Sequence, residues 1–127
     1  MQIVAGLSDS DAENLILNII EKEKFVVWDE MVKLAKEHGL SVSRLRRIVL
    51  DMIERGEIIE LTCRIFTKFS IISMLTHDEM VSIIVKKLKK IGKKKCGKPL
   101  AESSKVLKLF KIRFNKNSEP EVIISCA

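Results

Sequence analysis

The stretch KEHGLSVSRLRRIVLDMIERGEI, residues 36–58, decides the fold, because two helical patterns meet in it with almost nothing between them. Gly39 is placed to end the first helix in the left-handed conformation, and Ser41 is placed to cap the second. From Val42 onward, apolar residues recur at helical spacing until Gly56 interrupts the run. The stretch therefore predicts two helices joined by a tight turn, the second with three arginines in its first two turns.

The residues on either side of this stretch predict further short elements. SDAE at residues 10–13 predicts a capping box that opens the first helix at Ser10, and FVV at residues 25–27 is long enough for one brief strand. EIIELTCRIFTKFS, residues 57–70, predicts two strands around a tight turn at residues 62–64. The expected order is thus helix, strand, helix, helix and β-hairpin.

The remaining residues predict an amphipathic helix and a second hairpin. THDE at residues 76–79 is another capping box, which opens a helix that ends at Gly92. A basic connector with glycine and proline follows, and two strands are predicted, one from Phe110 and one over residues 121–126. Residues 99–109 fit either a helix or a strand.

The composition is that of a folded protein with an uneven charge. Of the 127 residues, 46% are hydrophobic and 31% are charged, which argues against disorder and for solubility. No apolar run approaches the roughly 20 residues of a membrane span, and the N-terminus lacks the basic start of a secretory signal. Residues 1–76 contain 10 basic and 12 acidic side chains, whereas residues 77–127 contain 13 and 5. We therefore expect a cytoplasmic protein without a membrane partner, whose basic character lies downstream.

The cysteines give no framework for a metal site or for disulfides. Cys63, Cys96 and Cys126 are an odd number, lie far apart and form no C-x-x-C motif. We therefore predict three free thiols in a reducing cytosol, no bound metal and no cofactor. Glutamine occurs once, while lysine, glutamate and isoleucine are abundant, a usage typical of thermophiles.

The order of elements over residues 10–70 resembles that of the winged helix-turn-helix family of small prokaryotic and archaeal DNA-binding regulators. Within it, residues 38–58 look like the turn, the recognition helix and the first wing strand of that family. Leu40 and Ser41 would follow the turn and cap the helix, and residues 54–58 would lead into the wing.

The resemblance implies both an architecture and a function. The implied fold is α+β, mainly α with a small β part. It would comprise a winged helix over residues 1–75. The residue pattern adds an amphipathic helix, a basic connector and a C-terminal β-hairpin over residues 76–127. The implied function is binding of double-stranded DNA in transcription regulation.

Polar and basic side chains occupy the outer face of the helix that follows Ser41. Its inward-turned apolar positions are Val42, Leu45, Ile48 and Val49. An arginine fork that reaches guanine O6 and N7 discriminates bases by about 1–3 kcal/mol, and a free helix N-terminus favours phosphate. The residues predicted to contact DNA on this face and around the wing are Ser41, Ser43, Arg44, Arg46, Arg47, Arg64 and Lys68. The alternative is an ordinary solvated face on which Arg44 and Arg47 pair with Asp51.

The strongest charge feature is KKLKKIGKKKCGK, residues 86–98. Its lysines fan outward from the apolar stripe and suit phosphate contacts that are independent of sequence and sensitive to salt. The lysines predicted to make these contacts are Lys86, Lys87, Lys89, Lys90, Lys93, Lys94 and Lys95. The alternative is a lysine coat that only keeps the chain soluble.

The apolar stripe of the same helix is predicted to form a homodimer contact, because a winged helix already has its three core helices. The residues of this expected interface are Met80, Val81, Ile84, Val85 and Leu88. Paired recognition helices would then read a palindromic site.

The motifs exclude the common enzyme classes and leave three binding functions. No phosphate-cradling glycine loop, nucleophile elbow or metalloprotease motif occurs, so no catalytic residue is predicted. A dimeric transcriptional regulator bound to double-stranded DNA is the favoured function. A winged helix that binds protein within a larger assembly is the main alternative, and the net negative charge of residues 1–76 favours it. An RNA-binding module is the third, although few aromatic side chains are present for base stacking.

Overall fold

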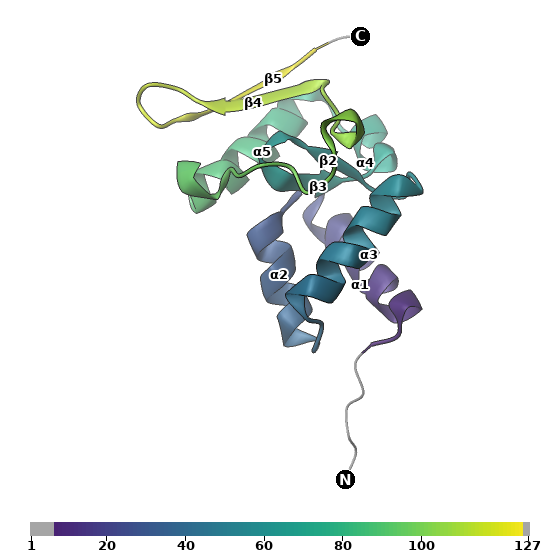
Figure 1. The fold of residues 1–127 in the computed structure, drawn as a ribbon. Helices are drawn as coiled ribbons and strands as arrows, with labels where there is room; N and C mark the ends of the chain where they lie inside the picture. The colour runs from purple at the N-terminus through teal and green to yellow at the C-terminus, as the bar shows by residue number, and fades with distance from the viewer. Residues whose placement is uncertain (1–6, 126–127) are drawn as a thin grey trace.

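The computed structural model describes residues 7–125, which form an α+β fold of helices and two small antiparallel sheets (Figure 1). The helices are α1 (Asp9–Glu23), α2 (Trp28–Glu37), α3 (Val42–Glu54), α4 (Phe69–Met74) and α5 (His77–Ile91). The strands are β1 (Val26–Val27), β2 (Ile59–Leu61), β3 (Ile65–Thr67), β4 (Phe110–Phe114) and β5 (Pro120–Ile124). Short 3-10 turns occupy Thr62–Arg64, Lys93–Lys95 and Ser103–Lys105. The mixed α+β class expected from the sequence is confirmed.

Helix α1 begins earlier than the sequence predicts. Its N-cap is Ser8, whose hydroxyl accepts a hydrogen bond from the Asp11 amide at 3.1 Å, so the prediction of a capping box at Ser10 is wrong. The earlier start brings Asp9 and Asp11 into the first turn, where carboxylates interact favourably with the helix dipole. Both serines suit a cap, and the earlier one lengthens the helix by two residues.

The turn between α2 and α3 is the predicted one. Gly39 adopts φ +79°, and the Leu40 amide folds back to donate to the Ala35 carbonyl at 2.9 Å. Leu40 is buried, and the Ser41 hydroxyl accepts from the Arg44 amide at 3.3 Å as the N-cap of α3. The local chemistry of glycine and serine therefore fixes this corner.

The first sheet has the strand order β1-β3-β2, with all neighbours antiparallel. The turn between β2 and β3 lies where the sequence predicts it, and it needs positive φ at Cys63 (+64°) and Arg64 (+54°). Phe66 of β3 packs against Trp28 at the start of α2, with their rings 5.9 Å apart. The sheet thus closes one end of the layer that α1, α2 and α3 form.

Helix α4 was not predicted. Residues 69–74 read FSIISM, which is too short and too uniformly apolar to show helical periodicity. Only Ile71 is buried, while Phe69 and Met74 are more than half exposed. In contrast, the capping box at the start of α5 is confirmed, because Thr76 and Glu79 exchange hydrogen bonds at 2.9 and 3.2 Å.

The apolar stripe of α5 packs against other parts of the same chain. Its buried residues are therefore not available for the predicted dimer contact. Met80, Ile84 and Leu88 are buried in the common core, and β5 lies along the helix (Figure 1). Val81 and Val85 are half-buried. The C-terminal hairpin therefore covers the face that the sequence assigns to a second subunit, because it is the nearer apolar partner.

One hydrophobic core joins the residues expected to form the winged helix with those expected to form its appendage. It contains Ile16 and Ile48 from the first part together with Leu88 and Ile112 from the second. Phe25 makes the connection directly, because its ring lies 6.3 Å from that of Phe110 in β4. The β4–β5 hairpin is therefore packed onto the helices and is not a loose appendage.

The segment from residue 99 to 107 returns across β2 and is fastened there by Glu60. The fully buried Glu60 carboxylate accepts hydrogen bonds from the amides of Leu100 and Ala101, both at 2.8 Å. The Glu60 carbonyl accepts from Leu107 at 2.8 Å, and Glu60 forms a parallel bridge with Val106. The segment is thus a single 3-10 turn and one β-bridge, not the longer helix or strand that were the two alternatives.

Cys63 and Cys96 form a disulfide, so the prediction that they are free thiols is wrong. Their spacing of 33 residues gave no sign of pairing, because the connector must first return past the β2–β3 turn. Beside the bond, the Arg64 guanidinium donates to the Lys98 carbonyl. Cys126, the third predicted thiol, lies outside the described residues.

Reduction of the disulfide should destabilise the protein measurably. In the chain-entropy account, a crosslink that closes a loop of this length stabilises by about 3–4 kcal/mol. We expect Cys63→Ser/Cys96→Ser to lower the free energy of unfolding in urea by that order, with Ser104→Ala as a surface control. The denatured chain should react with one equivalent of iodoacetamide before reduction and three afterwards. Three equivalents without reductant would contradict the bond.

Glu60 should give the protein a characteristic pH dependence. Burial raises the pKa of its carboxyl above the usual 4.5. The folded state therefore holds this proton more tightly than the unfolded state, and the stability that Glu60 contributes at low pH is lost as pH rises through the raised pKa.

The comparison with Glu60→Gln, which cannot titrate, isolates this effect. We expect the wild-type free energy of unfolding, relative to that of the variant, to decrease from about pH 4 to about pH 7. Urea titrations across this range measure it, with the exposed Glu102→Gln as control. A difference that stays constant or grows with pH would contradict the assignment.

Candidate nucleic-acid interface

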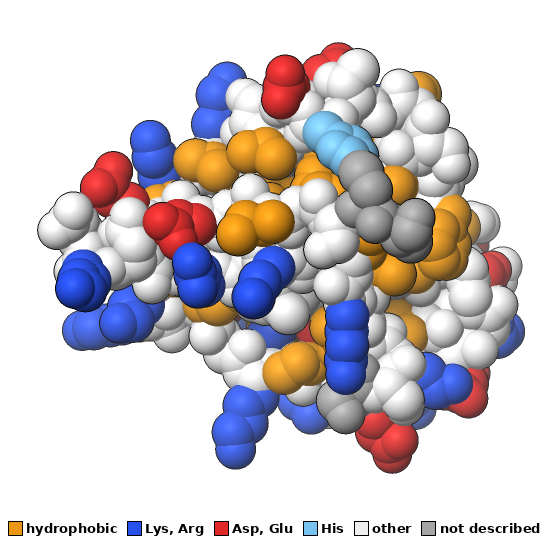
Figure 2. All heavy atoms as spheres, turned by 90° about the horizontal axis from the view of Figure 1, so that it is seen from above, with side chains coloured by type: hydrophobic (Ala, Val, Ile, Leu, Met, Phe, Trp, Pro, Cys, Tyr) orange, Lys and Arg blue, Asp and Glu red, His pale blue; other side chains and the backbone are white. Residues whose placement is uncertain are grey.

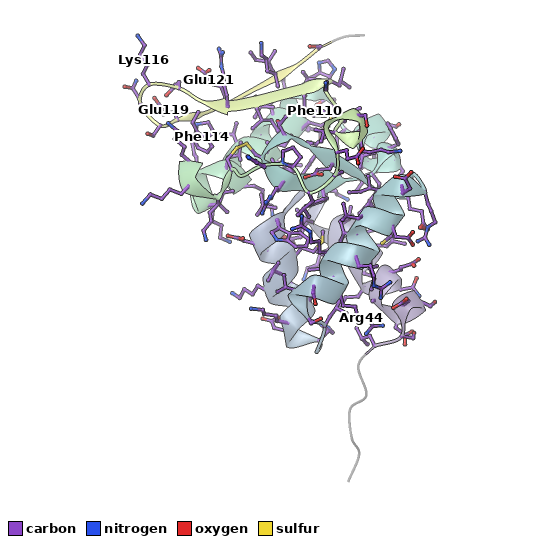
Figure 3. The ribbon with its side chains drawn as sticks, viewed as in Figure 1. Arg44, Phe110, Phe114, Lys116, Glu119 and Glu121 are labelled. Atoms are coloured by element: carbon purple, nitrogen blue, oxygen red, sulfur yellow. A yellow bond between two sulfur atoms is a disulfide. The ribbon has the colours of Figure 1, made fainter. Side chains whose placement is uncertain are left out.

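The start of α3, where Arg44 lies, is at the end of the molecule opposite the β4–β5 hairpin (Figure 3). Leu45, Ile48 and Val49 are buried against α1 and α2, as predicted. This packing turns the remaining side chains of the first two turns outward, and those that are exposed are Ser41, Ser43, Arg46 and Arg47. Val42 corrects the prediction, because it is 38% exposed at the very start of the helix, where the core no longer covers it.

Asp9 of α1 organises two of the predicted arginines. Its Oδ1 accepts from the guanidinium groups of Arg44 at 2.8 Å and Arg47 at 3.3 Å. These hydrogen bonds, Arg44 first, lower the pKa of Asp9. Two cations thus share one anion, and the patch stays positive. The alternative pairing of both arginines with Asp51 is wrong, because Asp51 pairs with Arg55 at 3.0 Å.

Acidic side chains predominate around the second half of α3. Arg55, at its C-terminal end, binds Glu13 at 2.7 Å, and the Glu57 carboxylate as well as that of Asp51 surrounds the same guanidinium. Glu54 is exposed beside them. The positive part of α3 is therefore confined to its first two turns, which is the part of a recognition helix that enters a groove.

The two residues predicted on the wing, Arg64 and Lys68, bind different parts of the chain. Arg64 is half-buried and bonded to the connector, and Lys68 pairs with Glu21 of α1. Cys63 at the tip of the turn is 4% exposed, because β4 and the connector pack against it. Arg64 and Lys68 are therefore both held by groups of the same chain, unlike the exposed arginines of α3.

The lysine tract divides into structural and exposed members. Lys87 is half-buried and its ammonium lies between the carboxylates of Glu23 at 2.7 Å and Glu30 at 2.9 Å. Despite the burial, these hydrogen bonds raise the pKa of Lys87, and its bond to Glu23 lowers the pKa of that carboxyl. Lys95 pairs with Asp29 at 3.2 Å. The other exposed lysines among those predicted are Lys86, Lys89, Lys90, Lys93 and Lys94.

A groove of about 730 Å³ runs between α1, α2 and the end of α5. Its walls combine acidic side chains such as Asp29 and Glu37 with basic ones such as Lys33 and Lys90, around the apolar Leu34. This alternation of charges favours no single class of ligand. Of the lysine tract, Lys90 and Lys95 line the groove, whereas the arginines of α3 are not among its lining residues.

Sequence reasoning missed Asp9 as a partner of the arginines and Glu23 and Glu30 as partners of Lys87. In each case the partners lie 35 or more residues apart. Only the packing of α1 on α3, and of α5 near α1 and α2, brings them together. The only indication of such partners in the sequence is the excess of acidic over basic residues before residue 77.

The described chain has no helix with both the length and the apolar composition to cross a membrane. Comparison of the sequence with protein-family models and with curated proteins, and of the structure with solved structures, finds no match. The geometry of α3 and of the lysines therefore carries the functional conclusion by itself.

Substitution of two neighbouring lysines of α5 should distinguish a lysine that stabilises the fold from one that only lies on the surface. Lys87→Met removes the cation between two partly buried carboxylates, and we expect the free energy of unfolding to fall by about 1–3 kcal/mol. Lys86→Met, one residue away and exposed, should change it by less than about 0.5 kcal/mol. Chemical denaturation of both variants measures the difference. Equal effects would contradict the structural role of Lys87.

Proposed function

We propose that residues 9–67 form a winged helix-turn-helix and that the protein binds double-stranded DNA through the first two turns of α3. The order α1-β1-α2-α3-β2-β3 and the sheet order β1-β3-β2 support the fold assignment. The tight turn at Gly39 and the cap at Ser41 support it locally.

The single observation that carries the function is the exposed basic start of α3. Ser43, Arg46 and Arg47 are exposed around the N-terminus of the helix, which Ser41 caps. The partial positive charge of that terminus favours a phosphate, while the arginine forks match guanine edges in the major groove. The opposite side of α3 is anchored by fully buried residues, which holds these side chains on a rigid element.

The role of the remaining residues differs from the usual winged-helix arrangement. The β2–β3 turn is covered, so Arg64 and Lys68 contribute little to DNA contact, and α3 supplies the sequence-dependent contacts. The exposed lysines of α5 and the following turn add attraction that is sensitive to salt. Because α5 is occupied by β5, the DNA-binding unit that we propose is one chain, acting as a cytoplasmic regulator of transcription.

A protein-binding winged helix is the second candidate, and the covered β2–β3 turn favours it. A wing that is bonded to the chain's own connector cannot reach into a DNA groove. In that case the exposed start of α3, with Val42 beside Ser43, would form a contact with protein. Binding measurements with nucleic acid distinguish the two candidates.

Removal of two arginines from α3 should weaken duplex binding. We expect Arg46→Ala/Arg47→Ala to reduce affinity for a labelled random duplex at least tenfold at low salt and to lower the slope of log K against log salt by up to about 2. Fluorescence anisotropy with duplex, single-stranded DNA and RNA measures this. The matched control, Arg113→Ala/Lys116→Ala, removes the same charge from the hairpin at the opposite end (Figure 3) and should have a much smaller effect.

Asp9→Asn provides a test in the other direction. Loss of its negative charge frees Arg44 and Arg47 from their shared partner, so duplex affinity should rise severalfold while the fold is retained. No binding of duplex by the wild-type chain at low salt would refute the DNA proposal and favour the protein-binding candidate. Equal loss in the α3 variant and in its control would show that the binding is not located on α3.

A further inference from the structure

The β4–β5 hairpin has an unpaired edge along β4. At one end of the hairpin the Ser125 amide donates to the Leu109 carbonyl, and at the other the Asn115 amide donates to the Glu119 carbonyl, both at 2.9 Å. Backbone groups alternate sides along an antiparallel strand, so the odd-numbered residues of β4 face β5. The amides and carbonyls of Phe110, Ile112 and Phe114 therefore face away from β5.

These outward groups have no hydrogen-bond partner within residues 7–125. Phe110 is 1% exposed, so its backbone groups have little access to bulk water, whereas Ile112 at 8% and the half-buried Phe114 form the more open end of this edge. A shielded backbone donor or acceptor without a partner is costly, and more than nine in ten find one. The edge of β4 is thus an unfilled position for another strand.

A groove of about 500 Å³ lies beside this edge. Its other wall is formed by Thr62 of the β2–β3 turn with Pro99 and Val106 of the returning segment. The Thr62 hydroxyl is buried there and has no partner among the described residues. The groove therefore combines an apolar floor with several unsatisfied polar groups, which is the chemistry of a site for extended peptide.

The charges that line the groove indicate which kind of peptide it binds. Lys108 and Lys111 line it, neither makes an ion pair with a described residue, and no acidic side chain is among its lining residues. Figure 2 shows the molecule from above, where exposed apolar side chains lie among basic ones and a smaller number of acidic ones. We propose that an extended, acidic peptide segment of a partner protein adds to β4 as a third strand of the hairpin.

The register of β4 defines the pattern of this peptide. Five residues, from Phe110 to Phe114, span about 17 Å and offer three amides and three carbonyls to the incoming strand. Peptide side chains on the outer face meet Lys111 and take acidic residues. Those on the inner face lie over Thr62 and Val106 and take small apolar residues.

A second copy of the chain fits the edge poorly. Antiparallel pairing of two β4 strands about Ile112 would place Lys111 opposite Arg113 and Lys108 opposite Lys116. A shift of two residues in register would place Lys111 opposite itself. Like charges directly opposite each other on one face of a sheet are destabilising, and edge lysines prevent such self-association.

This inference does not depend on DNA binding, because the hairpin lies at the end of the molecule far from Arg44 (Figure 3). A partner that occupies β4 leaves the exposed start of α3 free. The two surfaces can therefore be tested separately on the same full-length chain.

The test measures amide hydrogen exchange by NMR on the ¹⁵N-labelled full chain. The probe is a blocked six-residue peptide of alternating glutamate and valine. We expect it to slow exchange of the Ile112 and Phe114 amides at least tenfold, while those of Lys111 and Arg113, already bonded to β5, stay unchanged. A peptide of alternating lysine and valine should have no such effect.

Charge reversal tests the selection of the occupant. Lys108→Glu/Lys111→Glu should abolish protection by the glutamate peptide and create protection by the lysine peptide. The matched control Lys89→Glu/Lys93→Glu, with the same change in charge on and after α5, should leave the preference unchanged. Both variants replace exposed side chains, and their NMR spectra report that the fold is intact.

Several results would overturn the proposal. The edge is already covered if the Ile112 and Phe114 amides are slow to exchange in the dilute free protein. Protection that rises with protein concentration alone, together with self-association in the ultracentrifuge, would assign the edge to a second copy. Equal protection by both peptides, or none at millimolar concentration, would exclude an acidic strand.

Discussion

The position of the C-terminal half depends on one buried carboxylate. Glu60 lies in β2 with no exposed surface, and its two oxygens accept the amides of Leu100 and Ala101. Burial of a carboxylate is unfavourable, so these two hydrogen bonds hold the returning segment at one place along β2. The disulfide between Cys63 and Cys96 holds the chain just before this segment begins. Together they set where β4 begins and hence where the hairpin lies on α5.

This attachment divides the surface of the molecule. It covers the β2–β3 turn, which leaves the start of α3 as the exposed basic feature at one end. At the other end it holds β4 beside the turn with one edge unpaired. A winged helix with a free wing would present α3 and the turn to the same duplex. Here the turn is covered by β4 and the connector, so DNA contact by α3 and peptide contact by β4 are independent proposals.

The parts of the fold that sequence predicts well are those set by neighbouring residues. Gly39, Ser41 and the capping box at Thr76 act within one turn of helix, so the boundaries they specify are confirmed. Prediction fails where two local solutions compete, as with Ser8 and Ser10 at the start of α1. It also fails for α4, because a six-residue helix with one buried side chain shows no helical periodicity in its sequence.

The sequence by itself determined the α+β class, the tight helical corner, the two hairpins and the presence of basic side chains on α3 and α5. It did so because periodicity, caps and turn residues act locally. Only the tertiary structure decided which charges remain available and which faces remain open. Asp9 holds Arg44, Glu23 and Glu30 hold Lys87, and β5 covers the stripe of α5. These partners are distant along the chain, and only packing brings them within a hydrogen bond of one another.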